Sequence, residues 1–182
     1  MRSDHDIYVE LLVLRAQDGD RQAFAALVDY FHPRLLRHAR HLTRDVEAAA
    51  DVVQEAWLVV ARSLRRLDDP ACFGTWVYRI VGNKSHDWLR RRVRGRETTQ
   101  SLQADPPVED YARGEHDGEI ARVRAALTQL SRDQRAVLSM YYLDDMSVRE
   151  IADALSLPLG TVKSRLFYGR NRLKQVLEGG DR

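Results

Sequence analysis

The first half of the chain has apolar residues at spacings of mostly three and four, which is the pattern of amphipathic helices. These apolar stripes predict three helices, over residues 21–42, 45–67 and 73–92. Pro33 lies inside the first and predicts a kink there, because proline cannot donate the helical hydrogen bond. Thr43 and Asp45 are candidate caps for the second, which we expect to end near Pro70. No strand-type alternation occurs, so the pattern predicts an all-α fold.

Residues 97–118 interrupt this pattern. They are polar, contain the adjacent prolines Pro106 and Pro107, and have Arg113 as their only base among many acids. Such a segment is typical of a linker. We therefore expect two small helical domains, residues 1–94 and 119–182, joined by a flexible acidic linker over residues 95–118.

The second domain has sharper helix signals. Ser131 with Gln134, and Ser147 with Glu150, have the spacing of reciprocal capping boxes, and they predict helices over residues 132–143 and 148–155. A turn at residues 156–160 follows. The last helix then runs to about residue 177 and buries the following stripe: Val162, Leu166, Gly169, Leu173 and Leu177. This order of elements is typical of a helix-turn-helix.

The last predicted helix has five basic residues and no acidic residue between Thr161 and Lys174. In a DNA-reading helix, residues near the N-terminal end reach base edges, and bases further along bind phosphate. A solvated basic face is the other interpretation of a charge run alone. The two capping boxes and the turn favour the DNA-reading interpretation.

A second basic block lies between Arg79 and Arg96, with seven bases against one acid, Asp87. Such a block is an electrostatic footprint for a phosphate backbone. Aromatic residues, including Trp76 and Trp88, lie among these bases, and an exposed ring can stack on an unpaired base at about 1–3 kcal/mol. Most of these rings are expected in the hydrophobic core.

An acidic patch with one apolar neighbour is expected on the second helix, formed by Asp51, Gln54, Glu55 and Leu58. It is off the apolar stripe of that helix, and one interpretation is a docking surface for a basic partner. The others are a solvated face and a nuclease using the carboxylates of Asp51 and Glu55, for which no histidine or third acid has a matching offset.

Composition limits the other function classes. Cys72 is the only cysteine, and no run of eighteen apolar residues occurs. The N-terminal residues lack the features of a secretory signal, so we expect a cytoplasmic protein. His32, His38 and His41 lack the further ligand of a zinc site, and no catalytic motif is present, so we expect no metal, no cofactor and no enzyme activity.

Several of these segments resemble a known family. The sequence LSRDQRAVLSMYYLDDMSVREIADALSLPLGTVKSRLFYGRNRLKQVL looks like region four of bacterial RNA polymerase sigma factors, and it also resembles the LuxR-type helix-turn-helix. The segments ADVVQEAWLVV and FGTWVYRIVGNKSHDWLRRR look like sigma region two. A LuxR-type receiver would instead need alternating strands and helices. With region one and a folded region three missing, the resemblance is to the extracytoplasmic-function (ECF) subfamily.

The resemblance implies which residues carry function. It places the acidic patch on the clamp helices of the polymerase β′ subunit, and Asn83 near a base flipped from the non-template strand, in a pocket that residues 66–72 help to form. The implied region-two DNA contacts are Trp76, Arg79, Asn83, Lys84, Arg90, Arg91 and Arg92. The implied region-four DNA contacts are Arg149, Thr161, Lys163, Ser164, Arg165, Phe167, Tyr168 and Arg170. Tyr168 and Gly169 depart from the family pattern of arginine and alanine.

The implied function is delivery of polymerase to promoters. The expected partners are core RNA polymerase, through its β′ clamp helices and β flap, promoter DNA, and an anti-sigma factor. Membrane contact is expected only through a membrane-bound anti-sigma factor. A stand-alone LuxR-like regulator and the nuclease remain open alternatives.

Overall fold

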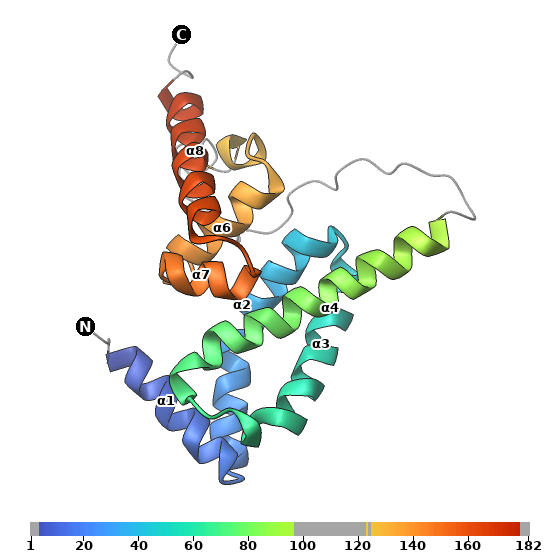
Figure 1. Ribbon diagram of the computed structural model, residues 1–182, viewed down its shortest axis with the longest axis vertical. Helices are drawn as coiled ribbons and strands as arrows, with labels where there is room; N and C mark the ends of the chain where they lie inside the picture. Colours follow the sequence, from blue (N-terminus) through green and yellow to red (C-terminus); the bar gives the residue numbers. More distant parts are fainter. Residues whose placement is uncertain (1–3, 97–122, 124, 179–182) are drawn as a thin grey trace, which may run out of the picture. The chain divides into compact units, whose positions relative to one another are not determined.

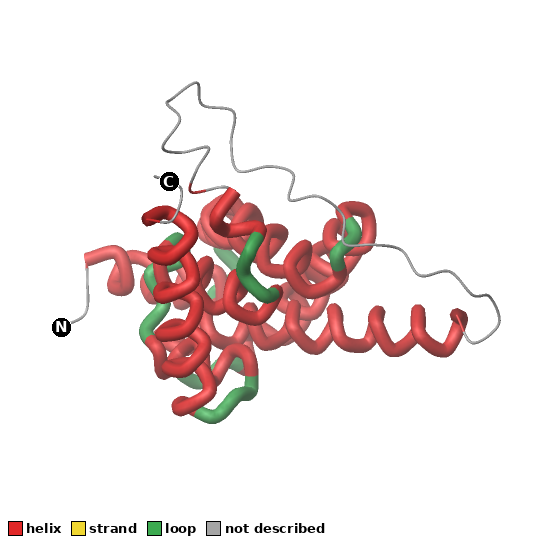
Figure 2. Tube along the Cα trace, turned by 90° about the horizontal axis from the view of Figure 1, so that it is seen from above, coloured by secondary structure: helices red, strands yellow, loops and turns green. Residues whose placement is uncertain are grey.

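The computed structural model describes residues 4–96, 123 and 125–178, which divide into two compact units (Figure 1). The first contains α1 (Asp4–Gln17), α2 (Arg21–Thr43), α3 (Val46–Ser63), the 3-10 turns η1 (Leu64–Arg66) and η2 (Pro70–Cys72), and α4 (Phe73–Arg96). The second contains α6 (Arg132–Tyr142), most of α7 (Val148–Leu155) and α8 (Leu159–Glu178), preceded by helical residues 125–128. The described residues contain no strand (Figure 2), so the predicted all-α fold is confirmed.

Local hydrogen bonds explain where the helices of the first unit begin and end. Asp20 caps α2 by accepting from the backbone N–H groups of Gln22 at 2.9 Å and Ala23 at 3.1 Å. These bonds, with that from Ala23 the largest cause, lower the pKa of Asp20. Asp45 caps α3 through the N–H of Ala48 at 3.0 Å.

Two details of α2 differ from the sequence-based expectation. Thr43 is part of α2, where its hydroxyl donates to the Ala39 carbonyl at 2.9 Å, so it is not the cap of α3. Arg44 then adopts a left-handed conformation with φ 58°, which ends the helix. Pro33 lies within α2, which runs on to Thr43.

The core of the first unit forms around α2, which packs against α1, α3 and α4, while α3 also packs against α4. Its fully buried side chains include Leu27, Leu35, Val53, Val60, Phe73, Val77 and Val81. The helices α2, α3 and α4 therefore each bury an apolar face in this core. Residues 95 and 96, expected in the linker, are the last residues of α4, and the expected linker from residue 97 onward is outside the described residues.

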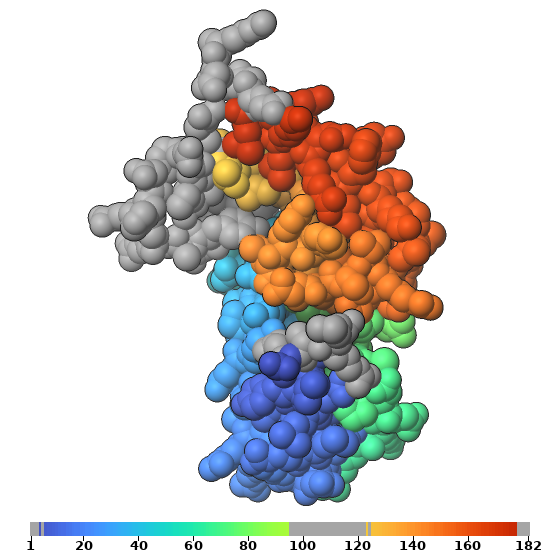
Figure 3. Space-filling model, turned by 90° about the vertical axis from the view of Figure 1, so that its left-hand side faces the viewer, coloured from blue at the N-terminus to red at the C-terminus, as the bar shows by residue number. Residues whose placement is uncertain are grey.

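The helix α1 is an element that the apolar pattern did not predict. Leu12 and Val13 are buried against the rest of the unit, whereas Ile7 and Leu11 on the outer side are 55% and 50% exposed. The outer side of α1 faces the viewer as dark blue spheres in Figure 3. Apolar residues on both sides blur the single stripe from which a helix is recognised.

The second unit is built on the two predicted capping boxes. The Ser131 hydroxyl accepts from the Gln134 N–H at 3.3 Å, and the Gln134 side chain accepts from the Ser131 N–H at 3.0 Å. Ser147 and Glu150 form the same pair of bonds at 3.2 and 2.7 Å. Both predicted helix starts are confirmed, although α6 ends at Tyr142 and α8 already begins at Leu159.

Gly169 lies where α8 packs closely against α6. A Cβ atom at this position would lie 2.9 Å from Cδ1 of Leu138, which is 4% exposed, and 3.5 Å from Cβ of Gln134. The close approach of the two helices explains a glycine inside α8 despite its low helix propensity. It also gives a physical reason for the departure from alanine.

We expect Gly169→Val to lower the free energy of unfolding of the second unit by about 1–3 kcal/mol, because the added atoms overpack the contact with Leu138. Gly82→Ala is the matched control, because its Cβ would meet nothing within 4 Å and alanine improves helix propensity by about 0.5–1 kcal/mol. Urea unfolding followed by circular dichroism measures both changes. Equal stability of Gly169→Val and the natural protein would contradict the close approach.

His38 is a residue of α2 whose ring lies in the core of the first unit, against Tyr78 of α4. It is 2% exposed, and its ring centroid is 5.2 Å from that of Tyr78 in an edge-to-face arrangement. Desolvation, with smaller contributions from His41 and His86, lowers the pKa of His38 to about 3 from 6.5. The neutral ring is therefore the form that the folded protein holds at neutral pH.

This burial predicts a loss of stability in acid. Between pH 6.5 and about 3 the unfolded chain binds a proton at His38 that the folded chain does not bind. The free energy of unfolding therefore falls with decreasing pH by up to about 1.4 kcal/mol per pH unit. We expect the natural protein to lose about 2 kcal/mol relative to His38→Leu between pH 6.5 and 5.

Urea unfolding followed by tryptophan fluorescence isolates this effect, because all three tryptophans, Trp57, Trp76 and Trp88, lie in the first unit. His32→Leu, at an exposed position of α2, is the control and should keep the natural pH profile. Parallel pH profiles for His38→Leu and the natural protein would show that His38 does not carry the effect.

Candidate functional site

The outer face of α3 carries the predicted acidic patch. Its four residues, Asp51, Gln54, Glu55 and Leu58, are all exposed, and Leu58 is 52% exposed although it is apolar. Their spacing of three, one and three residues keeps them on one side of the helix. The opposite side of α3, with Val53 and Val60, is in the core. The structure thus brings the four predicted residues together on one accessible surface.

The outer face of α4 collects most of the predicted DNA contacts. At about 100° per residue, Trp76, Arg79, Asn83 and Arg90 fall within an arc of about 60°. Arg79, Asn83 and Arg90 are exposed, whereas Trp76 is half-buried with its ring 6.0 Å from that of Phe73. Arg91 is exposed beside this arc. An accessible amide therefore lies between accessible cations, which suits both a phosphate backbone and a base edge.

The two remaining region-two residues are held by other parts of the same unit. Lys84 is half-buried, and its Nζ lies 3.0 Å from Oε2 of Glu55 on α3. Arg92 lies about 180° around α4 from Asn83. Its guanidinium is 3.4 Å from the Asp45 carboxylate and 4.9 Å from the centre of the Trp88 ring. Arg92 therefore braces the start of α3 and is separate from the outer face of α4.

The segment before α4 is fastened by α1. The Gln17 side chain donates to the carbonyls of Leu64 at 2.9 Å and Leu67 at 2.8 Å, and Arg65 donates back to the Gln17 carbonyl at 3.1 Å. Asp69 then caps η2 through the N–H of Ala71 at 3.0 Å. Gln17 is a positioning residue that the sequence did not indicate, because its partners are 47 and 50 residues away.

In the second unit, α8 presents most of its predicted DNA contacts on its outer face. The exposed members are Lys163, Ser164, Phe167, Tyr168 and Arg170, and Arg149 is exposed at the start of α7. Phe167 and Tyr168 are 59% and 61% exposed, which is unusual for two large rings in direct contact. Thr161 is half-buried, and the Ser164 hydroxyl donates to the Gly160 carbonyl at 2.8 Å.

Two arginines of α8 also have partners on α6. The half-buried Arg165 donates to the Asp133 carboxylate, and the Arg170 guanidinium lies 5.1 Å from the Tyr141 ring centre and 5.5 Å from that of Tyr142. These contacts hold α8 against α6. Both arginines therefore have a structural role beside any contact with a partner.

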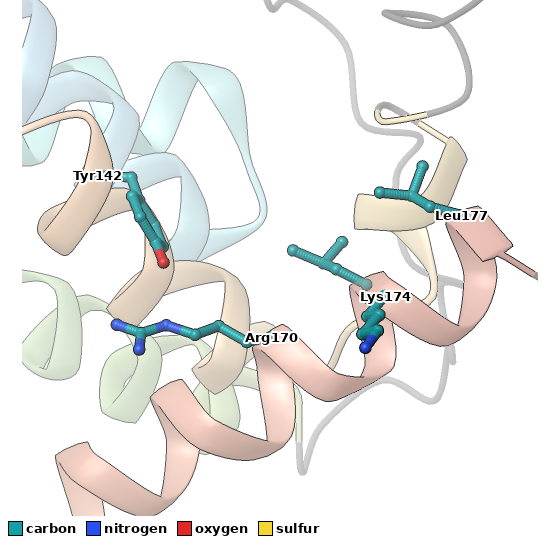
Figure 4. A pocket seen from close by; sticks show the side chains of 5 residues that line it. Tyr142, Arg170, Lys174 and Leu177 are labelled. Atoms are coloured by element: carbon teal, nitrogen blue, oxygen red, sulfur yellow. The ribbon is translucent and has the colours of Figure 1, made fainter.

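An open groove of about 500 Å³ lies along the C-terminal half of α8 (Figure 4). It is lined by Tyr142, Arg170, Leu173, Lys174 and Leu177. The lining is apolar with a basic rim, and the neighbouring Leu143 is 46% exposed. Such a surface is typical of a protein contact.

The described residues contain neither a cluster of three or more metal-ligating side chains nor a helix long and apolar enough to cross a membrane. Asp51 and Glu55 lie together on α3 without a third acid or histidine close enough to form such a cluster within the described part of the chain.

Each of the two units matches a known protein family. The Sigma-70 region 2 model matches residues 27–95, and the Sigma-70, region 4 model matches residues 120–173. The ECF RNA polymerase sigma factor RpoE of Cereibacter sphaeroides is 30% identical over 182 residues, covering 96% of this chain and 97% of its own. The chain belongs to the ECF sigma factors of bacterial RNA polymerase.

Two further similarities cover almost the whole sigma factor. The RNA polymerase sigma-H factor of Pseudomonas aeruginosa is 30% identical over 178 residues, covering 92% of each chain. The solved structure of CnrH in complex with the cytosolic domain of CnrY is 26% identical, covers 94% of this chain and 98% of CnrH, and has a TM-score of 0.62.

Membership of this family decides between the alternatives. The protein binds core RNA polymerase and promoter DNA and directs promoter-specific transcription initiation. Region 2 in the first unit is incompatible with a LuxR-like regulator, whose N-terminal half would be a receiver of strands and helices. The family has transcription initiation factors as its members, which is consistent with a protein that is not an enzyme.

Proposed function

We propose that the sigma factor binds its partners through three separate surfaces. The acidic patch on α3 docks on the β′ clamp helices, the outer face of α4 captures unpaired bases of the minus-ten element, and the outer face of α8 reads the upstream element. The observation that carries this proposal is the segregation of exposed charge onto separate helices. Acids gather on α3, whereas bases gather on α4 and α8. Opposite charges on separate faces suit two different partners, one basic and one a polyanion.

Within this scheme the individual DNA contacts have different roles. Arg79, Arg90 and Arg91 bind the phosphate backbone, and Asn83 contacts a flipped base. Residues 66–72, held by Gln17, form one wall of its pocket. On α8, Lys163 and Phe167 reach base edges, whereas Arg170 contacts phosphate while remaining against Tyr141. Exposure supports the assigned DNA contacts, because all of the side chains given one are exposed: Arg79, Asn83, Arg90, Arg91, Lys163, Phe167 and Arg170.

The groove along α8 is the best candidate for the contact with the β flap. The part of its lining proposed for the flap is apolar and includes Leu173 and Leu177. This surface is along the C-terminal half of α8, away from the exposed Lys163 and Phe167 near the start of the helix. One helix could therefore contact polymerase and DNA at the same time.

We further propose the domain division 1–94, 95–118 and 119–182, a cytoplasmic location, no catalytic activity of the protein itself, and control by an anti-sigma factor. The complex of the similar protein CnrH with the cytosolic domain of CnrY supports a protein partner of this kind. Such a partner would act by covering the surfaces that bind polymerase or DNA.

Reconstituted transcription tests the proposed function. Purified core RNA polymerase is mixed with this protein and a library of random promoter fragments, and transcripts are sequenced. We expect initiation at a shared pair of sequence elements only when both proteins are present. Replacing the protein by its 119–182 segment should abolish initiation, because the α3 and α4 surfaces are then missing. Initiation that is equal without the protein would refute the proposal.

A further inference from the structure

An ion pair joins the surface proposed for polymerase to the surface proposed for DNA. Nζ of Lys84 on α4 lies 3.0 Å from Oε2 of Glu55 on α3. Glu55 belongs to the acidic patch, and Lys84 is the neighbour of Asn83 on α4. The side chain of Lys84 is 32% exposed and that of Glu55 is 47% exposed, so each can reach a partner outside the protein.

Lys84 is placed where it can contact either Glu55 or DNA bound near Asn83. It lies about 100° around α4 from Asn83, on the side that turns toward α3. A lysine ammonium is a point charge on a flexible four-carbon stem, so it can bind either the Glu55 carboxylate or a phosphate near Asn83. It cannot neutralise both at full strength. In the free protein, with no DNA present, Lys84 contacts the Glu55 carboxylate.

We propose that this ion pair couples polymerase docking to DNA binding: Glu55 holds Lys84 in the free sigma factor, and polymerase releases Lys84 to the promoter when it binds Glu55. The inference rests on the docking role proposed for the acidic patch and on the DNA role proposed for α4. Release also removes the repulsion between the Glu55 carboxylate and a nearby phosphate. The release of Lys84 and the loss of this repulsion both strengthen DNA binding. An exposed ion pair of this kind changes a binding constant by about fivefold at most.

Linkage makes the coupling reciprocal. If polymerase on Glu55 strengthens DNA binding through Lys84, then DNA on Lys84 strengthens polymerase binding through Glu55 by the same factor. Two unproductive complexes are thereby weakened, namely DNA bound without polymerase and polymerase bound without DNA. The complex of all three components is favoured.

A double-mutant cycle on the full chain tests the DNA side of this coupling. The variants are Glu55→Gln, Lys84→Met and their combination, and the probe is a fluorescein-labelled single-stranded DNA of mixed sequence without polymerase. We expect Glu55→Gln to raise DNA affinity about twofold to fivefold. We also expect it to steepen the salt dependence by about 0.7, which is the contribution of one phosphate contact in a single strand. In the Lys84→Met background the gain should shrink to the part that comes from removing the Glu55 charge near a phosphate.

Asp51→Asn is the matched control, because it removes the same charge one helical turn away on the same face. We expect a smaller gain from it, one that persists in the Lys84→Met background because it reflects general electrostatics. A gain from Glu55→Gln that is as large in the Lys84→Met background as in the natural protein would overturn the coupling. Unchanged circular dichroism and tryptophan fluorescence verify that the variants are folded.

The polymerase side uses purified core RNA polymerase without DNA. We expect Lys84→Met to strengthen binding about twofold to fivefold when Glu55 is present, and to have no effect in the Glu55→Gln background. If reversing the charges of Asp51 and Glu55 leaves polymerase binding unchanged, the docking role itself fails. If that reversal weakens binding but the DNA cycle is additive, the docking role stands and only the coupling is refuted.

Discussion

Changing both Asp51 and Glu55 to lysine is expected to lower the affinity for core RNA polymerase by about 100-fold or more. Both carboxylates are exposed on one face of α3, and the proposed partner surface is basic. Reversal therefore replaces two attractive contacts by repulsive ones, and like charges placed together in an interface cost several kcal/mol. Folding should be little affected, because exposed substitutions usually change stability by about ±0.5 kcal/mol.

The measurement is a titration of fluorescently labelled core polymerase at fixed salt. The matched control is Asp18→Lys with Asp29→Lys, which makes the same change in net charge at exposed positions outside α3. A comparable loss in the control would mean that net charge and not the acidic patch determines docking. Retained affinity in the Asp51 and Glu55 variant would remove the patch from the docking role.

Variants of α8 are expected to separate sequence choice from general affinity. Lys163→Ala and Phe167→Ala should change which upstream elements are preferred, because both side chains are exposed on the first half of α8. A base pair that is no longer read changes discrimination by about 1–3 kcal/mol, which is about 5-fold to 150-fold. Arg170→Ala and Lys174→Ala should instead weaken all promoters alike and lower the salt slope by about one each.

Holoenzyme binding to a library of upstream elements, at two or more salt concentrations, measures both quantities. Arg172→Ala is a useful companion, since this exposed arginine is on the same helix without an assigned role. If all four variants reduced binding by the same factor on every sequence, the proposed division between reading and phosphate contact along α8 would be wrong.

Much of the local structure follows directly from the sequence. The three helices after residue 20, both capping boxes and the helix-turn-helix are recognisable because each depends on residues within four positions of one another. The same holds for the exposed acidic patch and the basic faces, since a helical period determines which residues share a side. The helix α1 was not predicted, because its apolar residues lie on both sides of the helix. Leu12 is buried, whereas its neighbour Leu11 is exposed.

Partners across the fold could not be read in this way. Glu55 and Lys84 are 29 residues apart, Asp133 and Arg165 are 32 apart, and Arg92 lies 47 residues from its partner Asp45. Periodicity shows which side of a helix faces outward, but not which residue of another helix lies opposite. The packing of α4 on α3 therefore decided that Lys84 contacts the acidic patch, although the sequence indicates only a basic residue beside Asn83.

The same distinction explains the two residues with the least expected environments. Periodicity alone places Gly169 on the buried stripe of α8, yet only the closeness of Leu138 on α6 shows that a larger residue would not fit. His38 was recognisable as one of three nearby histidines, whereas its burial beside Tyr78 and its lowered pKa depend on how α2 and α4 meet. The sequence by itself determined the helices and the charge of their faces, because these depend on neighbours along the chain. Tertiary structure decided the contacts between faces, because these depend on the distances and angles at which the helices pack.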